Sequence, residues 1–135
     1  PDMVNALMRV KSNIDSGLTQ AIQEMGIAAL DLPTEWLDNN NAVYQKRRDK
    51  VVSVLNEIGV PAVAPKGALY IWTPIPEGYT SAEFAQKLLD EVDVVVTPGN
   101  GYGPGGEGYI RLSLTIPDDQ IDEGLRRLAK LRVGG

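Results

Sequence analysis

The chain has 135 residues, a formal net charge of −5, and neither cysteine nor histidine. Its length is that of one ordinary domain, and its acidic charge without a lysine and arginine cluster argues against nucleic-acid binding. The missing residue types exclude disulfides, thiolate catalysis, the most common general base and the most common metal ligand, so catalysis would depend on other side chains or a cofactor.

The first 30 residues predict two helices and show no signal peptide. The chain begins with Pro1 rather than methionine, which is consistent with a piece of a longer protein. Apolar residues recur at helical spacing over residues 2–10 and 18–30, on either side of a turn-forming stretch. No apolar run approaches the roughly 20 residues of a membrane span. Because Asp-Leu-Pro at 31–33 interrupts the pattern, we expect a helical segment over residues 1–30 and a second domain over residues 31–135.

The longest periodic segment begins the second domain. Apolar residues repeat every seven positions from Leu37 to Ile58, which predicts a long helix over residues 34–58. Its opposite face is expected to be a solvated surface that carries Lys46, Arg47, Asp49, Lys50 and Glu57. Arg47 and Arg48 are both expected to be surface charges. The helix should end at Gly59, because glycine favours the position just past a helix end and Pro61 prevents continuation.

Short β-branched and aromatic stretches follow the long helix and alternate with two further helices. Thr80 has the spacing of a capping box, and Pro117 suits the first turn of a last helix. Two close strands without a helix between them favour antiparallel pairing. The predicted fold class is therefore α+β, a small and mainly antiparallel sheet covered by helices. The strands are expected at residues 60–65, 68–76, 92–98 and 109–115.

The last predicted strand carries one arginine on its polar side. By the period of two, the apolar residues from Ile110 to Ile116 face the core, and Arg111 points the other way. A guanidinium on a rigid strand fits a carboxylate or phosphate with two hydrogen bonds. The alternative is a solvent-facing arginine that pairs with a local acidic residue. The glycine-rich stretch at 98–108 would then either cover a ligand or let one approach the backbone.

Other candidates are weighed against ordinary structural uses. The glycines of residues 99–106 resemble a nucleotide-binding loop, but no helix follows to supply the anion site, which argues against that interpretation. Tyr70 and Trp72 alternate with apolar residues, and core packing is the more common use of such aromatics, with a cavity as the alternative. Ser12 and Asn13 lie in a stretch whose composition is typical of turns.

Several stretches together resemble the C-terminal portion of the fold-type I pyridoxal-phosphate aminotransferases. In order and spacing, the resemblance is carried by YQKRRD (44–49), PKGALYIW (65–72) and VVVTPGNGYGPGGEGYIRLSL (94–114). Within this family, the segment RVKSNIDSGLTQAIQEMGIAAL (9–30) most resembles the LL-diaminopimelate aminotransferase branch. The resemblance covers essentially the whole chain, and it implies that residues 31–135 form the small C-terminal domain of such an enzyme.

The resemblance also implies site residues and a cofactor. Arg111 matches the arginine that holds the α-carboxylate of the substrate. Asn13, with Ser12, matches a segment that approaches the active site of the partner subunit, and it is the second substrate-binding candidate. No lysine of this chain matches the family's Schiff-base lysine. The implied cofactor, pyridoxal 5′-phosphate, therefore belongs to the full-length enzyme, and we expect this chain alone to bind none and to be inactive.

The full-length protein is thus expected to be a cytoplasmic, homodimeric transaminase of amino-acid biosynthesis, acting on an amino acid and a 2-oxo acid. We expect no metal, no nucleic-acid partner and no membrane partner. Two alternatives remain. One is a free-standing carboxylate-binding or regulatory domain that reuses the fold. The other is a structural dimerisation module in which Arg111 is a surface residue.

Overall fold

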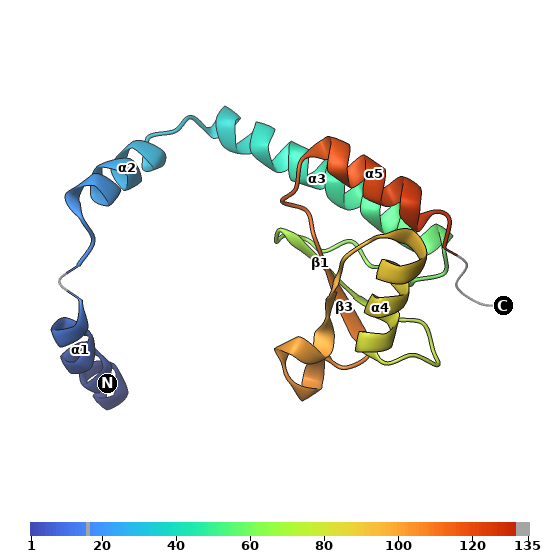
Figure 1. The fold of residues 1–135 in the computed structure, drawn as a ribbon. Coiled ribbons are helices and arrows are strands. Elements are labelled where there is room, and N and C mark those ends of the chain that lie inside the picture. The colour runs from blue at the N-terminus through green and yellow to red at the C-terminus, as the bar shows by residue number, and fades with distance from the viewer. Residues whose placement is uncertain (16, 132–135) are drawn as a thin grey trace. The chain divides into compact units, whose positions relative to one another are not determined.

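The computed structural model of the chain describes residues 1–15 and 17–131 (Figure 1). The chain divides into two compact units, Pro1–Asp38 and Asn39–Gly135. Across the described residues, no helix combines the length and the apolar character that crossing a membrane requires. The helices are α1 (Asp2–Ile14), α2 (Gln20–Leu30), α3 (Thr34–Glu57), α4 (Ser81–Val92) and α5 (Asp118–Leu128), the short 3₁₀ helices are η1 (Gly99–Tyr102) and η2 (Pro104–Gly106), and the strands are β1 (Tyr70–Pro74), β2 (Thr97–Pro98) and β3 (Tyr109–Ser113).

The first unit contains α1 and α2, and neither helix buries a residue. Large apolar side chains stay exposed along both, and Met3 and Leu30 reach 88% and 87%. The helix α1 continues four residues past its predicted end at residue 10. The predicted turn is therefore partly wrong. Lys11 pairs with Asp15 at 2.8 Å, one helical turn further on, which stabilises the extra turn.

The second unit is built on a three-stranded sheet with one buried face. The strand order is β1-β3-β2, and both pairings are antiparallel. Along β3, Ile110 and Leu112 are buried while Tyr109 and Ser113 are exposed, as the period of two predicts. In Figure 1, α3 and α5 run alongside each other within this unit. The helices complete the core with Val51, Leu55, Phe84, Leu88, Val92, Ile121, Leu125 and Leu128.

These elements confirm the predicted α+β class and the long helix. Val51 and Leu55 are the buried residues of α3. Gly59 has a φ of 88°, and the N–H of Val60 donates to the carbonyl of Leu55 at 2.9 Å, which closes the helix end as predicted. The capping box of α4 at Thr80 is also present.

The face of α3 predicted to be solvated is instead joined to α5. Arg47 is 16% exposed, and its guanidinium donates to Asp118 at 2.5 Å and to the carbonyl of Leu114 at 2.9 Å. Lys50 pairs with Asp122 at 2.5 Å. The prediction of a free surface is therefore wrong for Arg47, because a period of seven identifies the apolar stripe but not a neighbouring helix that meets its edge.

One predicted strand is absent, and the other three are predicted longer than β1, β2 and β3. Residues 60–65 form no strand, because the side chain of Asn56 donates to the carbonyl of Ala62 at 3.0 Å and accepts its N–H at 3.1 Å. This segment therefore bonds to the end of α3 rather than to the sheet. The stretch 92–98 contributes only β2 to the sheet. Ile116 lies beyond the end of β3 and is 41% exposed, although the alternation placed it in the core.

Candidate functional site

Arg111 lies in the central strand of the sheet, on the face opposite the core. Its register partners are Trp72 of β1 and Thr97 of β2, so paired strands fix its backbone on both sides. The side chain is half-buried, between the buried residues Ile110 and Leu112. The sequence prediction of a guanidinium on a rigid, polar strand position is confirmed.

Two tyrosine rings flank the guanidinium of Arg111. Its Cζ lies 4.2 Å from the centroid of the Tyr70 ring and 4.9 Å from that of the Tyr102 ring. Such cation–π contacts orient a guanidinium without using its N–H donors. Tyr70 and Trp72 are each 40% exposed, so the expectation of core packing is wrong for both. The short strand β1 places them on the face of the sheet that Arg111 occupies.

Trp72 connects the remaining aromatic side chains of this face. Its ring stacks on Tyr109 with centroids 5.5 Å apart, and meets the edge of Tyr102 at 5.7 Å. We call Tyr70, Trp72, Tyr102 and Tyr109 the aromatic cluster. Because Tyr102 belongs to η1 and the others to the strands, the cluster holds the glycine-rich loop against the sheet beside Arg111.

Arg111 differs from most arginines of the chain in its electrostatic partners. Over residues 1–15 and 17–131, its side chain makes neither an ion pair nor a hydrogen bond with the protein. The described residues therefore do not support the alternative in which Arg111 pairs with a local acidic residue. The N–H groups of a planar guanidinium then remain available to a carboxylate. The arginines that do pair with a carboxylate are Arg47, Arg48, Arg126 and Arg127.

The glycine-rich loop folds tightly onto itself. A Cβ added at Gly99 would lie 2.0 Å from the carbonyl oxygen of Gly106 and 2.7 Å from that of Tyr109. A Cβ at Gly106 would lie 2.0 Å from the carbonyl oxygen of Gly99. One expectation was that the glycines let a ligand approach the backbone closely. In the structure, another part of the same loop makes that close approach. These two glycines let η1 and η2 close, and this closure carries Tyr102 to Arg111.

Glu107 is a structural residue of this site that the sequence analysis missed. Its Oε1 accepts the main-chain N–H of Ser81 at 2.7 Å and the hydroxyl of Ser81 at 2.9 Å, and it also accepts the N–H of Gly108 at 3.1 Å. The Ser81 main-chain bond is the main cause that lowers the pKa of Glu107, followed by the Ser81 hydroxyl. Because 26 residues separate Glu107 from Ser81, no local spacing could have revealed the contact.

Asn13 lies in the last turn of α1, not in a turn between helices. Its side-chain amide donates to the carbonyl of Arg9 at 2.7 Å, and the residue is exposed. Asn13 belongs to the first unit and Arg111 to the second, so each candidate is described within its own unit. The substrate-binding role of Asn13 stays a prediction.

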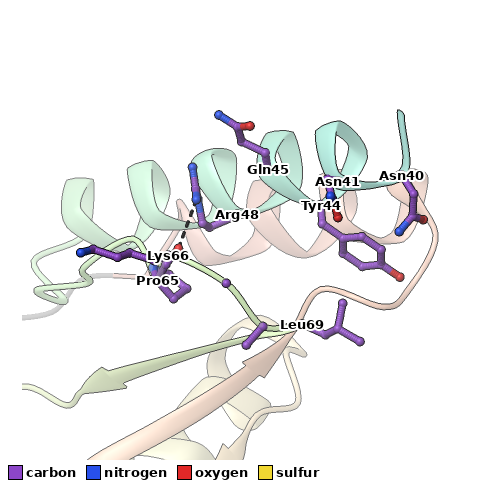
Figure 2. Close-up of a pocket in the computed structure, with 10 residues that line it drawn as sticks. Asn40, Asn41, Tyr44, Gln45, Arg48, Pro65, Lys66 and Leu69 are labelled. Carbon is purple, nitrogen blue, oxygen red and sulfur yellow. Dashed lines mark hydrogen bonds between the residues drawn. The ribbon is translucent and has the colours of Figure 1, made fainter. Parts of the chain in front are cut away.

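A cavity of about 380 Å³ lies between α3 and the segment before β1 (Figure 2), and Arg111 is not among the residues that line it. Tyr44 and Leu69 contribute to its wall. Arg48 donates to the carbonyl of Pro65 at 3.1 Å across one side, as Figure 2 shows, and pairs with Asp49 at 2.7 Å. The bond to Pro65 joins the segment to the helix, so Arg48 has a structural role.

Comparison with known proteins places this geometry in a family. The model of the aminotransferase class I and II family matches residues 1–128. The LL-diaminopimelate aminotransferase of Dehalococcoides mccartyi is 58% identical over 130 residues, which cover 96% of this chain and 34% of that protein. The protein of the same name from Moorella thermoacetica is 49% identical over 130 residues, covering 96% and 33%.

The fold gives the same result. A solved aminotransferase structure from Staphylococcus aureus matches with a TM-score of 0.82 and 34% identity, covering 96% of this chain and 34% of that one. The chain thus spans about a third of the length of the curated relatives it matches, and it corresponds to their C-terminal part. In sequence and in fold, the chain belongs to the class I and II aminotransferases.

Proposed function

We propose that this chain supplies the substrate-carboxylate site of a transaminase, an enzyme that moves an amino group between an amino acid and a 2-oxo acid. Family membership supports the reaction class. The relatives named LL-diaminopimelate aminotransferase favour an amino-acid biosynthetic substrate related to diaminopimelate. The observation that carries the proposal is Arg111, oriented by two tyrosine rings and without a carboxylate partner over residues 1–15 and 17–131.

The chemistry of the substrates matches this site. Every amino acid and every 2-oxo acid carries an α-carboxylate, which a guanidinium binds in its own plane through two charge-assisted hydrogen bonds. Each such bond contributes about 1.5–3 kcal/mol. Because Arg111 belongs to a strand paired on both edges, the bound carboxylate would be fixed relative to the fold. Such fixing reduces the loss of translational and rotational entropy that the chemical step would otherwise require.

Pyridoxal 5′-phosphate is the cofactor that the family implies, and we propose that the rest of the full-length protein holds it. A covalent anchor needs an amine that readily loses its proton. Lys11, Lys50 and Lys87 are instead held in ion pairs with carboxylates. Hydrogen bonding to Glu91 raises the pKa of Lys87, which opposes deprotonation. These three lysines are therefore poorly suited to anchor the cofactor. The part that the proposal assigns to this chain is carboxylate binding.

The first unit has a different role in the proposal. Residues 1–30 would pack on the remainder of the protein or on the partner subunit of a homodimer, and Asn13 would approach the substrate of that partner. The apolar side chains of α1 and α2 support this, because Met3, Leu7 and Leu30 are 88%, 66% and 87% exposed. A cytoplasmic location is part of the same proposal.

An activity assay on the full-length protein tests the proposal. With pyridoxal phosphate, we expect transfer of the amino group from amino acids, including LL-diaminopimelate, to a 2-oxo acid. The 135-residue chain alone should transfer none. Borohydride reduction of that chain with the cofactor should fix no stoichiometric label on a lysine. A full-length protein that binds the cofactor without amino transfer, or a lone chain that fixes one equivalent, contradicts the proposal.

A further inference from the structure

Glu107 joins the first turn of α4 to the start of the strand that carries Arg111. Its Oε1 accepts two bonds from Ser81 and one from Gly108, at 2.7, 2.9 and 3.1 Å. The hydroxyl of Ser81 also accepts the N–H of Gly108 at 3.0 Å, and Ser81 is fully buried. We call these three residues the Glu107 bridge.

The bridge fixes the point at which β3 begins. Gly108 has a φ of 84°, a conformation that side-chain-bearing residues rarely adopt, and its carbonyl accepts the N–H of Ile75 at 2.9 Å. The next residue, Tyr109, opens β3 and stacks on Trp72. Because Arg111 follows two residues later, the geometry at Gly108 determines where its side chain meets the aromatic cluster.

The bridge also closes the glycine-rich loop that carries Tyr102. Glu107 directly follows Gly106, whose backbone lies against that of Gly99 so closely that neither residue tolerates a Cβ. Tyr102 lies within this closed loop, and its ring is 4.9 Å from the Cζ of Arg111. The anchoring of the loop at Glu107 and the position of that ring are therefore mechanically connected.

The first turn of α4 has a second carboxylate, Glu83, with which Glu107 can be compared. Glu83 accepts the N–H and the hydroxyl of Thr80, both at 2.8 Å, and completes a capping box. The helix therefore has its own cap, whose hydrogen bonds join Thr80 and Glu83. The bonds of Glu107 lower the pKa of its carboxyl, so the bridge is charged at neutral pH.

We propose that Glu107 is a positioning residue for substrate binding, which acts through Ser81 and Gly108 to hold Arg111 and Tyr102 in their carboxylate-binding arrangement. The inference rests on the proposed role of Arg111. According to this proposal, loss of Glu107 weakens substrate binding more than loss of a cap of α4 would.

The test compares variants of the full-length protein in the amino-transfer assay. Glu107→Ala should raise the KM for the amino donor about tenfold, as the loss of a charge-assisted network predicts, with the cofactor spectrum unchanged. Glu107→Gln keeps an oxygen acceptor for Ser81 and should give a smaller rise. The matched control, Glu83→Ala, removes the other carboxylate of the same helix end. It should lower the Tm by a similar amount but leave KM within about twofold.

The outcomes distinguish a role of the Glu107 bridge in substrate binding from an effect on stability alone. They also distinguish failure of this inference from failure of the proposed function. An unchanged KM in folded Glu107→Ala, or an equal rise in Glu83→Ala, overturns the inference. If Glu107→Ala does not fold, Ser81→Ala removes only the hydroxyl arm and should still raise KM, and no rise overturns the inference. If Arg111→Lys weakens substrate binding but the bridge variants do not, the proposal for the Glu107 bridge is refuted and the proposed function is not. An unaffected Arg111→Lys refutes the proposed function as well.

Discussion

The guanidinium of Arg111 is oriented by aromatic rings rather than by a carboxylate. Carboxylates hold four other arginines, whereas two tyrosine rings orient this one. A ring contacts the π-face of the guanidinium and leaves the N–H edge available, which is the edge that a carboxylate binds. The aromatic cluster is thus part of the proposed site, although its residues carry no charge.

Replacing Tyr102 tests this role of the ring. In the full-length protein, Tyr102→Ala should weaken carboxylate binding by about 0.5–2 kcal/mol, the value of one cation–π contact. Tyr102→Phe keeps the ring and should bind substrate almost as the parent does. The measurement is the KM for an amino donor in both variants. Equal effects of alanine and phenylalanine would assign the role to the hydroxyl instead.

The glycines of the loop differ sharply in what they tolerate. Gly99→Ala should destabilise the second unit by about 1–3 kcal/mol or more, because its Cβ would lie 2.0 Å from a backbone oxygen. Gly105→Ala is the matched control, since nothing lies within 4 Å of its added Cβ. Urea unfolding followed by tryptophan fluorescence compares them. Equal stability of the two variants would mean that the loop is open.

At the scale of elements, carboxylates fasten α4 and α5 to their surroundings. Hydrogen bonds from Thr80, with the main-chain bond the largest cause, lower the pKa of Glu83, and those from Ser81 lower that of Glu107. On α5, the bond from Lys50 lowers the pKa of Asp122. A carboxyl whose pKa is lower in the folded state stabilises the fold at neutral pH.

This predicts a specific pH dependence of stability. The contribution of each lowered carboxyl is fully present above its unfolded pKa, about 4.3 for glutamate, and is lost as the pH falls through its folded value. The free energy of unfolding should therefore fall below pH about 4.3, and Glu83→Gln should make that fall shallower. Urea titrations between neutral and acid pH measure it. An identical acid slope in Glu83→Gln would contradict the assignment.

At the scale of the whole molecule, the two units differ in how they bury apolar surface. The second unit has a continuous core, whereas α1 and α2 have no buried residue. Helices of 13 and 11 residues are only marginally stable without packing. In the proposed full-length enzyme, the remaining two thirds of the protein or the partner subunit would supply that packing.

Hydrogen exchange on the isolated chain tests this difference. The amides of α1 and α2 should exchange quickly, while those of Ile110 and Leu112 in the central strand should be protected. The comparison requires a sample shown to be monomeric, because self-association would also cover the apolar side chains. Protection of both helices equal to that of β3 in such a monomer would contradict the proposed need for a cover.

The sequence predicted the local features of the fold better than the long-range ones. The helices, the end of α3 at Gly59 and the face on which Arg111 lies all follow from spacing. The strand at 60–65 was wrong because Asn56 bonds to that segment. Glu107 and the aromatic cluster were missed for the same reason, since their partners are brought together only by folding.

The central claim is that Arg111 binds the α-carboxylate, and Arg111→Lys in the full-length protein tests it most directly. Lysine keeps the charge but loses the planar pair of donors, so kcat/KM should fall by at least the roughly 1.5–3 kcal/mol of one charge-assisted bond. We expect the fall for two chemically different amino donors, because both share the carboxylate, with the cofactor spectrum unchanged. An unchanged kcat/KM, or a loss confined to one donor, would contradict the account.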